Sequence, residues 1–287
     1  MIKKEFFIEN NDIKLHSNLY IPNEKNKFPA LLLIHGFLSS KEEYGDLPSK
    51  LSEKSYVVLT FDFRGHGKSN GDRGYYTSKS HLQDSSSALN FLLNHENVDN
   101  EKFAVIGHSL GSIAASRLVT EDEKGKKART CILLCPPRKF EDSIGKLEKL
   151  AYKILYDLNS PILLFTGKHL YLPYKYKAKD ILLSPEAIRR LESKGDLQDK
   201  MPVANYKYMI EEINHEKIAS KINIPTLFIV AKNDKLISNS KSKMVFDAIN
   251  TNDKKYVEIT NTGHSIMMDY SSDKVYDEIV SWLENKM

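Results

Sequence analysis

Residues 102–113 read Lys-Phe-Ala-Val-Ile-Gly-His-Ser-Leu-Gly-Ser-Ile, an apolar run that leads into a Gly-x-Ser-x-Gly pattern. The run is typical of a buried strand, and the residues after Ser109 have the spacing of a helix. A change from strand to helix within one residue forces the serine backbone to positive φ. Gly107 and Gly111 remove Cβ atoms that would clash in so tight a turn. The stretch therefore predicts a nucleophile elbow, with the Ser109 hydroxyl above the end of a parallel sheet.

Continuous apolar runs recur along the chain, which indicates strands that are buried on both faces. They cover 29–34, 56–61, 102–106, 130–134, 225–230 and 256–259, after a predicted N-terminal hairpin over 5–9 and 14–21. Helical stretches alternate with them at 47–54, 78–94, 109–121, 240–249 and 272–285. This alternation predicts an α/β fold with a mostly parallel, doubly wound sheet.

One long segment interrupts the alternation of strands and helices. Between residues 136 and 222 no strong buried strand recurs, and a helical spacing of three and four runs from Ile144 to Leu158. Ser184-Pro185 is typical of a second helix start, and we expect a third helix over 203–213. The sequence thus predicts a core of residues 1–135 and 220–287, with a helical cap formed by residues 136–219. The stretch 160–177 has no pattern that assigns it.

Two loops after later strands supply the acid and the base that a nucleophilic serine needs. Asp234 follows the strand 225–230, and His264 follows the last strand. Because ligands bind at the carboxyl ends of the strands in such sheets, we expect both side chains to meet Ser109 there. An acid further upstream, as Glu141 or Asp142, is the alternative.

Backbone donors for a developing negative charge are predicted in two places. His35-Gly36-Phe37 directly follows the strand 29–34, and Leu110 directly follows the serine. We expect the N–H groups of Phe37 and Leu110 to form an oxyanion hole.

Composition excludes several other classes of protein. The 287 residues include 42 Lys and Arg against 38 Asp and Glu, a net charge of +4 that is too weak and too dispersed to indicate nucleic-acid binding. Cys131 and Cys135 lie too far apart on a strand to bridge, so we expect buried free thiols. No His, Asp and Glu cluster has metal-ligand spacing, and we expect neither a metal nor a cofactor. No membrane helix and no signal peptide are predicted, which favours a cytoplasmic protein. The oligomeric state is left open.

Five features occur in the order typical of one superfamily: the loop His35-Gly36-Phe37, the turn Phe61-Asp-Phe-Arg-Gly-His-Gly-Lys-Ser69, the elbow Gly107–Gly111, the loop Lys232-Asn-Asp234 and the pair Gly263-His264. The chain resembles the α/β-hydrolase superfamily of serine hydrolases over residues 1–135 and 220–287. Within it, the chain is similar to monoacylglycerol-lipase-like enzymes and to small intracellular esterases of the cinnamoyl/feruloyl type. The resemblance implies an α/β-hydrolase fold with a cap at the insertion.

The predicted function is hydrolysis of a small-molecule carboxylic ester through an acyl-enzyme on Ser109. We expect small to medium acyl, aryl-acyl or monoglyceride esters, with Ile144, Leu147, Ile154 and Leu158 of the cap as a wall of the substrate pocket. The same triad could instead serve acyl transfer or the hydrolysis of lactones, amides or C–C bonds. A non-catalytic binding protein with the hydrolase fold is the alternative from another class.

Overall fold

The computed structural model describes residues 1–173, 177–194 and 200–287. One sheet contains the strands β1 (Ile2–Asn10), β2 (Ile13–Ile21), β3 (Phe28–Ile34), β4 (Val57–Phe61), β5 (Val98–His108), β6 (Thr130–Leu134), β9 (Thr226–Ala231) and β10 (Lys254–Ile259). Their order in the sheet is β1-β2-β4-β3-β5-β6-β9-β10. The hairpin β1-β2 is antiparallel and pairs antiparallel with β4, and all the other neighbours are parallel. The predicted mostly parallel sheet is therefore confirmed.

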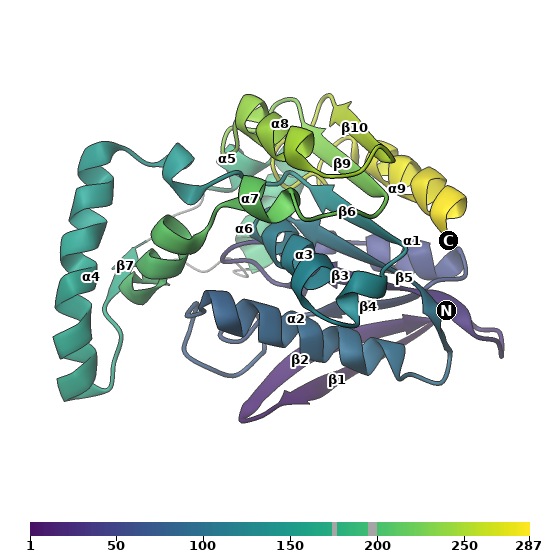
Figure 1. The fold of residues 1–287 in the computed structure, drawn as a ribbon, viewed down its shortest axis with the longest axis horizontal. Coiled ribbons are helices and arrows are strands. Elements are labelled where there is room, and N and C mark those ends of the chain that lie inside the picture. Colours follow the sequence, from purple (N-terminus) through teal and green to yellow (C-terminus); the bar gives the residue numbers. More distant parts are fainter. Residues whose placement is uncertain (174–176, 195–199) are drawn as a thin grey trace.

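Helices cover both faces of this sheet (Figure 1). The helices of the core are α1 (Leu47–Glu53), α2 (Ser78–Leu93), α3 (Leu110–Glu121), α8 (Asn239–Ala248) and α9 (Ser272–Lys286). Side chains of β3 alternate between the two faces: Leu32 and Ile34 pack with α2, α3 and α8, whereas Leu31 and Leu33 pack with α1 and α9. Burial of each such side chain contributes about 1.5–3 kcal/mol to stability. This two-sided packing explains why the strand sequences are continuously apolar.

The segment between β6 and β9 departs from the prediction in two details. It contains η3 (Phe140–Ser143), α4 (Lys146–Thr166), β7 (Tyr171–Pro173), α5 (Ala178–Ile181), α6 (Pro185–Lys194), β8 (Lys200–Pro202), η4 (Val203–Asn205), η5 (Lys207–Glu212) and α7 (His215–Ala219). The strands β7 and β8 form a small antiparallel sheet that was not predicted. The expected helix over 203–213 is a 3₁₀ turn followed by a π-helix, η5.

Helix α4 lies apart from the sheet and presents two different faces (Figure 1). Tyr156 on its inner face packs near Tyr206, with ring centroids 5.5 Å apart, and the buried Asn159 accepts a hydrogen bond from the backbone of Leu170 at 2.7 Å. The outer face exposes large apolar side chains: Leu147, Leu150, Ile154, Leu158, Ile162 and Phe165. Despite this apolar face, no helix in the described ranges has the length and hydropathy needed to cross a membrane.

Candidate active site

The turn between β5 and α3 holds Ser109 in a strained conformation. Ser109 has φ of 51° and ψ of −122°, in the positive-φ region that residues other than glycine rarely adopt. A Cβ on Gly107 would lie 2.3 Å from the carbonyl oxygen of Gly111, and one on Gly111 would lie 2.2 Å from that of Ile34. Both glycines are therefore required by close backbone contacts, as the sequence predicted. The turn places Ser109 at the N-terminus of the twelve-residue helix α3.

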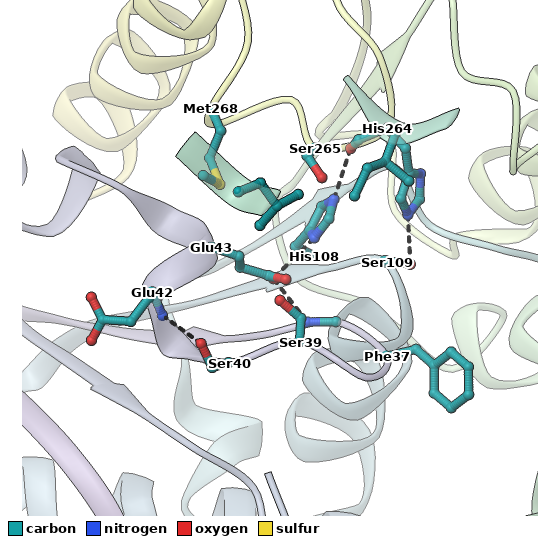
Figure 2. A pocket seen from close by; sticks show the side chains of 13 residues that line it. Phe37, Ser39, Ser40, Glu42, Glu43, His108, Ser109, His264, Ser265 and Met268 are labelled. Atoms are coloured by element: carbon teal, nitrogen blue, oxygen red, sulfur yellow. Dashed lines mark hydrogen bonds and ion pairs between the residues drawn. The ribbon is translucent and has the colours of Figure 1, made fainter. Parts of the chain in front are cut away.

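Three side chains from separate loops join in a chain of hydrogen bonds at this turn. The Nε2 atom of His264 lies 2.9 Å from Ser109 Oγ, and its Nδ1 atom lies 2.7 Å from Asp234 Oδ2 (Figure 2 shows the first of these contacts). Because an ionised carboxylate only accepts, Nδ1 of His264 carries the proton and donates it to Asp234. The Nε2 atom is then left to accept the hydroxyl proton of Ser109. This is the order in which hydrogen bonds run in a Ser-His-Asp triad.

The carboxylate of Asp234 is held in its ionised form. Its second oxygen, Oδ1, accepts the backbone N–H groups of Leu236 at 2.8 Å and Ile237 at 2.9 Å. Burial alone would raise the pKa of Asp234, but His264 and these N–H groups outweigh burial, so the pKa lies below its ordinary value of 3.8. The two alternative acids are engaged with cations, Glu141 with Lys149 and Asp142 with Arg138. Of these three acids, only Asp234 has an observed hydrogen bond to His264.

The loop after β3 passes close to Ser109. A Cβ on Gly36 would lie 3.1 Å from the Cβ of Ser109. The Nδ1 atom of His35 lies 2.8 Å from the carbonyl oxygen of Gly36, and His35 Nε2 accepts the N–H of Phe63 at 3.0 Å. Since the C=O of Gly36 and the N–H of Phe37 share one planar peptide, His35 also fixes the direction of that N–H.

A buried ion pair lies beside these loops (Figure 2). Glu43, in η1 (Lys41–Tyr44), accepts the N–H of Gly36 at 2.8 Å and contacts Nδ1 of His108 at 2.9 Å. The other ring nitrogen of His108 lies 2.9 Å from the carbonyl oxygen of His264. Burial favours the neutral ring, but the charge of Glu43 outweighs it and raises the pKa of His108 well above 6.5. The pKa of Glu43 is likewise lowered by His108 against the opposing effect of burial.

Two cavities meet at Ser109 and His264, and they differ in size. The smaller, of about 50 Å³, has the polar side chains of Ser39, Ser40 and Ser265 in its lining. The larger, of about 550 Å³, has apolar side chains in its lining (Leu110, Ile113, Phe140, Met209, Ile213, Leu236 and Ile237) and also the charged side chains of Arg138, Lys139, Asp142, Lys235 and Lys241. Phe37 contributes to both cavities. Ser109 thus lies between a small cavity, which Ile181, Leu191 and Met268 also line, and a large one, and both have polar and apolar side chains in their walls.

None of the four residues that were expected to form a cap wall for the substrate lines either cavity beside Ser109. Leu147, Ile154 and Leu158 are 84%, 53% and 52% exposed on the outer face of α4, and none of them lines either cavity beside Ser109. Ile144 packs against the cluster that contains Phe37 and does not line these cavities either. The spacing identified an apolar helix face correctly, but periodicity does not tell which side of a helix faces the protein.

Other predictions from the sequence have mixed outcomes in this region. Cys131 and Cys135 are free and buried, as expected, and burial raises the pKa of Cys131 to about 12. No functional role was predicted from the sequence for His108 or for Glu43. The one signal for Glu43 in the sequence is its position a few residues after His35-Gly36, which does not reveal that it is buried.

Comparisons with known proteins identify the family and the fold. The family model described as "Serine aminopeptidase, S33" matches residues 25–271. A carboxylesterase of Bacillus subtilis is 23% identical over 257 residues, which cover 89% of this chain and 92% of the relative. Among solved structures, a monoacylglycerol lipase of Paleococcus ferrophilus superimposes with a TM-score of 0.78 at 22% identity, covering 95% of this chain and 99% of the other. A monoglyceride lipase variant of Saccharomyces cerevisiae gives a TM-score of 0.84 at 14% identity, covering 100% and 96%. At these identities the structures show a shared fold.

Proposed function

This chain belongs to the serine aminopeptidase S33 family of α/β-hydrolases, and we propose that it is a serine carboxylic ester hydrolase. The observation that carries the proposal is the continuous hydrogen-bond path from Ser109 through His264 to Asp234. A bare Gly-x-Ser-x-Gly pattern would not suffice, because the base and the acid must also lie within hydrogen-bond reach. Here His264 lies within hydrogen-bond reach of Ser109, which is 155 residues away along the chain, and Asp234 lies within reach of His264, which is 30 residues away.

The proposed reaction starts with the Oγ atom of Ser109. As Oγ attacks the ester carbonyl carbon, its proton passes to Nε2 of His264, and Asp234 stabilises the resulting imidazolium. The backbone N–H groups of Phe37 and Leu110 hold the negative charge that develops on the carbonyl oxygen. His264 then gives its proton to the leaving alcohol, which departs from an acyl-enzyme. A water molecule deprotonated by His264 releases the acid and restores Ser109.

The two cavities support an assignment of the two halves of the substrate. The larger cavity, of about 550 Å³, suits the acyl group because Leu110, Ile113 and Met209 line it, and the smaller cavity, of about 50 Å³, leaves room only for a small leaving group. Each buried CH₂ contributes about 0.8 kcal/mol, which is about fourfold in kcat/KM. We therefore propose small to medium acyl esters as substrates, with kcat/KM rising along the series until the cavity is full. The segment 136–219 would act as a cap through Met209 and Ile213, which line this cavity.

The test combines a probe of the nucleophile with a substrate panel. A fluorophosphonate should label the wild-type protein and leave Ser109→Ala unlabelled, because the reagent requires an activated serine. On p-nitrophenyl and glyceryl esters of increasing acyl length, Ser109→Ala should lose on the order of 10⁶ in kcat. Aminoacyl anilides, lactones and an added alcohol acceptor test the amide, lactone and acyl-transfer alternatives in the same assay. A wild-type protein that is neither labelled nor active would favour the non-catalytic binding role.

A further inference from the structure

The ion pair of Glu43 and His108 joins two parts of the site that lie on different loops. Glu43 accepts hydrogen bonds from the N–H of Gly36 at 2.8 Å and from Nδ1 of His108 at 2.9 Å, and Nε2 of His108 donates to the carbonyl oxygen of His264 at 2.9 Å. One end is the loop that carries the Phe37 N–H, and the other end is the backbone of the residue placed as general base. The middle residue, His108, directly precedes Ser109.

The contacts of His108 define its protonation state. A backbone carbonyl oxygen only accepts hydrogen bonds, so the ring nitrogen that faces His264 carries a proton. The other ring nitrogen faces the Glu43 oxygen that already accepts the N–H of Gly36, and it must also donate. His108 is therefore an imidazolium. Cys135 Sγ lies near the ring nitrogens of His108 and His264, but both nitrogens of His108 are donors and offer no lone pair to a metal ion.

Stability alone does not account for this pair. The side chains of His108 and Glu43 are only 6% and 10% exposed, and the removal of two charges from water costs several kcal/mol per ion. Apolar side chains of similar volume commonly give equal or greater stability at such positions. What apolar side chains cannot do is hold a backbone N–H on one loop and a backbone carbonyl on another.

We propose that Glu43 and His108 are positioning residues. Together they hold the loop that carries the Phe37 N–H and the loop that carries His264 in their correct relative positions at Ser109. This inference rests on the proposed function. Glu43 fixes the N–H of Gly36 while His35 fixes its carbonyl, so the peptide that ends in the Phe37 N–H is held from both sides. His108 fixes the backbone from which the His264 ring projects. Neither residue exchanges a proton with the substrate in this scheme.

Breaking the ion pair of Glu43 and His108 should lower kcat. Loss of one oxyanion donor outright costs about 10²–10³ in kcat, and loss of a residue that only positions such groups should cost less. We expect Glu43→Ala and His108→Ala each to lower kcat by about 10- to 100-fold, with KM changed by less than about threefold. Glu43→Gln should retain more kcat than Glu43→Ala, because its amide oxygen can still accept the N–H of Gly36.

A matched control separates positioning from folding stability. Asp84, in α2, is a carboxylate of similar burial that pairs with Arg64 at 2.6 Å and lines neither cavity at Ser109. Asp84→Ala should lower the melting temperature without lowering kcat. The double variant Glu43→Ala/His108→Ala leaves no unpaired buried charge, so we expect it to fold even if a single variant does not. Its loss in kcat should be smaller than the product of the two single losses, since both residues belong to one chain of hydrogen bonds.

Rates of fluorophosphonate labelling distinguish failure of this inference from failure of the proposed function. If the wild-type protein is labelled at Ser109, the function stands and the variants test the positioning role alone. Labelling and kcat within threefold of wild type in the double variant would overturn that role. So would an equal loss of kcat in Asp84→Ala, or Glu43→Gln no more active than Glu43→Ala. An unlabelled wild-type protein would overturn both proposals.

Discussion

Substitution of Asp234 by asparagine tests the proposed triad through a single atom. In the structure, Oδ1 of Asp234 accepts two backbone N–H groups, from Leu236 and Ile237, and Oδ2 accepts Nδ1–H of His264. An asparagine must keep its oxygen toward the two backbone donors, because an NH₂ group there would face two N–H groups and lose both hydrogen bonds. Its NH₂ group then faces His264 and donates to Nδ1. The ring proton of His264 then lies on Nε2, and Nε2 can no longer accept the proton of Ser109.

The magnitude of the loss follows from the wrong tautomer. In a comparable triad this change costs about 10⁴ in kcat, which corresponds to about 5 kcal/mol of transition-state stabilisation. We expect Asp234→Asn to lose kcat by this order on a p-nitrophenyl ester while KM and the melting temperature change little. Glu141→Gln is the matched control, because Glu141 pairs with Lys149 and should not affect the tautomer of His264. Less than a tenfold loss in Asp234→Asn, or a comparable loss in Glu141→Gln, would refute the assignment of the acid.

Three further predictions concern the cavity, the ion pair and the elbow. Ile213→Trp fills part of the larger cavity, so it should lower kcat/KM for medium-chain esters but not for acetate esters. Leu158→Lys, on the outer face of α4, should leave the ranking of acyl lengths unchanged. A panel of p-nitrophenyl esters measures both effects, and an altered ranking in Leu158→Lys would show that α4 does line the substrate pocket. Because the pKa of His108 is raised above 6.5 in the folded protein, its contribution to stability is complete below about pH 6.5 and is lost as the pH rises through the raised value. Urea denaturation should therefore show the wild-type protein losing stability relative to Glu43→Ala/His108→Ala as the pH is raised above about 6.5, and a difference that stays constant would contradict the charged state of His108. Gly111→Ala, whose Cβ would meet the carbonyl oxygen of Ile34, should lower the free energy of unfolding by about 1–3 kcal/mol, and an unchanged urea midpoint would show that the contact relaxes at no cost.

The core of the fold could be predicted because its constraints are local to short segments. A strand buried on both faces must be apolar throughout, so Leu31–Ile34 and its counterparts were recognisable one by one. The elbow was recognisable for the same reason, since a tight strand-to-helix turn requires small residues at fixed positions around Ser109. The expected contacts of His264 also followed from topology, because parallel strands deliver their following loops to one edge of the sheet.

Contacts that depend on side-chain burial could not be predicted in this way. Glu43 follows the loop His35-Gly36-Phe37 in a stretch with two adjacent acids. Nothing in the order of the residues shows that the side chain of Glu43 is buried while that of Glu42 is half exposed. The small sheet of β7 and β8 was missed because each strand has only three residues, too few to establish an alternating pattern. Over a length as short as that of η5, a π-helix and an α-helix have the same spacing of apolar residues, so the sequence does not distinguish them.

If the larger cavity holds the acyl group as we propose, one part of its wall is linked to Asp234, the proposed catalytic acid, and another part is not. Leu236 and Ile237 line the larger cavity, and their backbone N–H groups hold Asp234. A change of side chain at either residue therefore alters the acyl wall and risks the orientation of the acid at the same time. Met209 and Ile213 line the same cavity from the end of the inserted segment, and neither has an observed hydrogen bond to Asp234. Acyl preference can thus be altered through the inserted segment while the hydrogen bonds of the proposed triad stay intact.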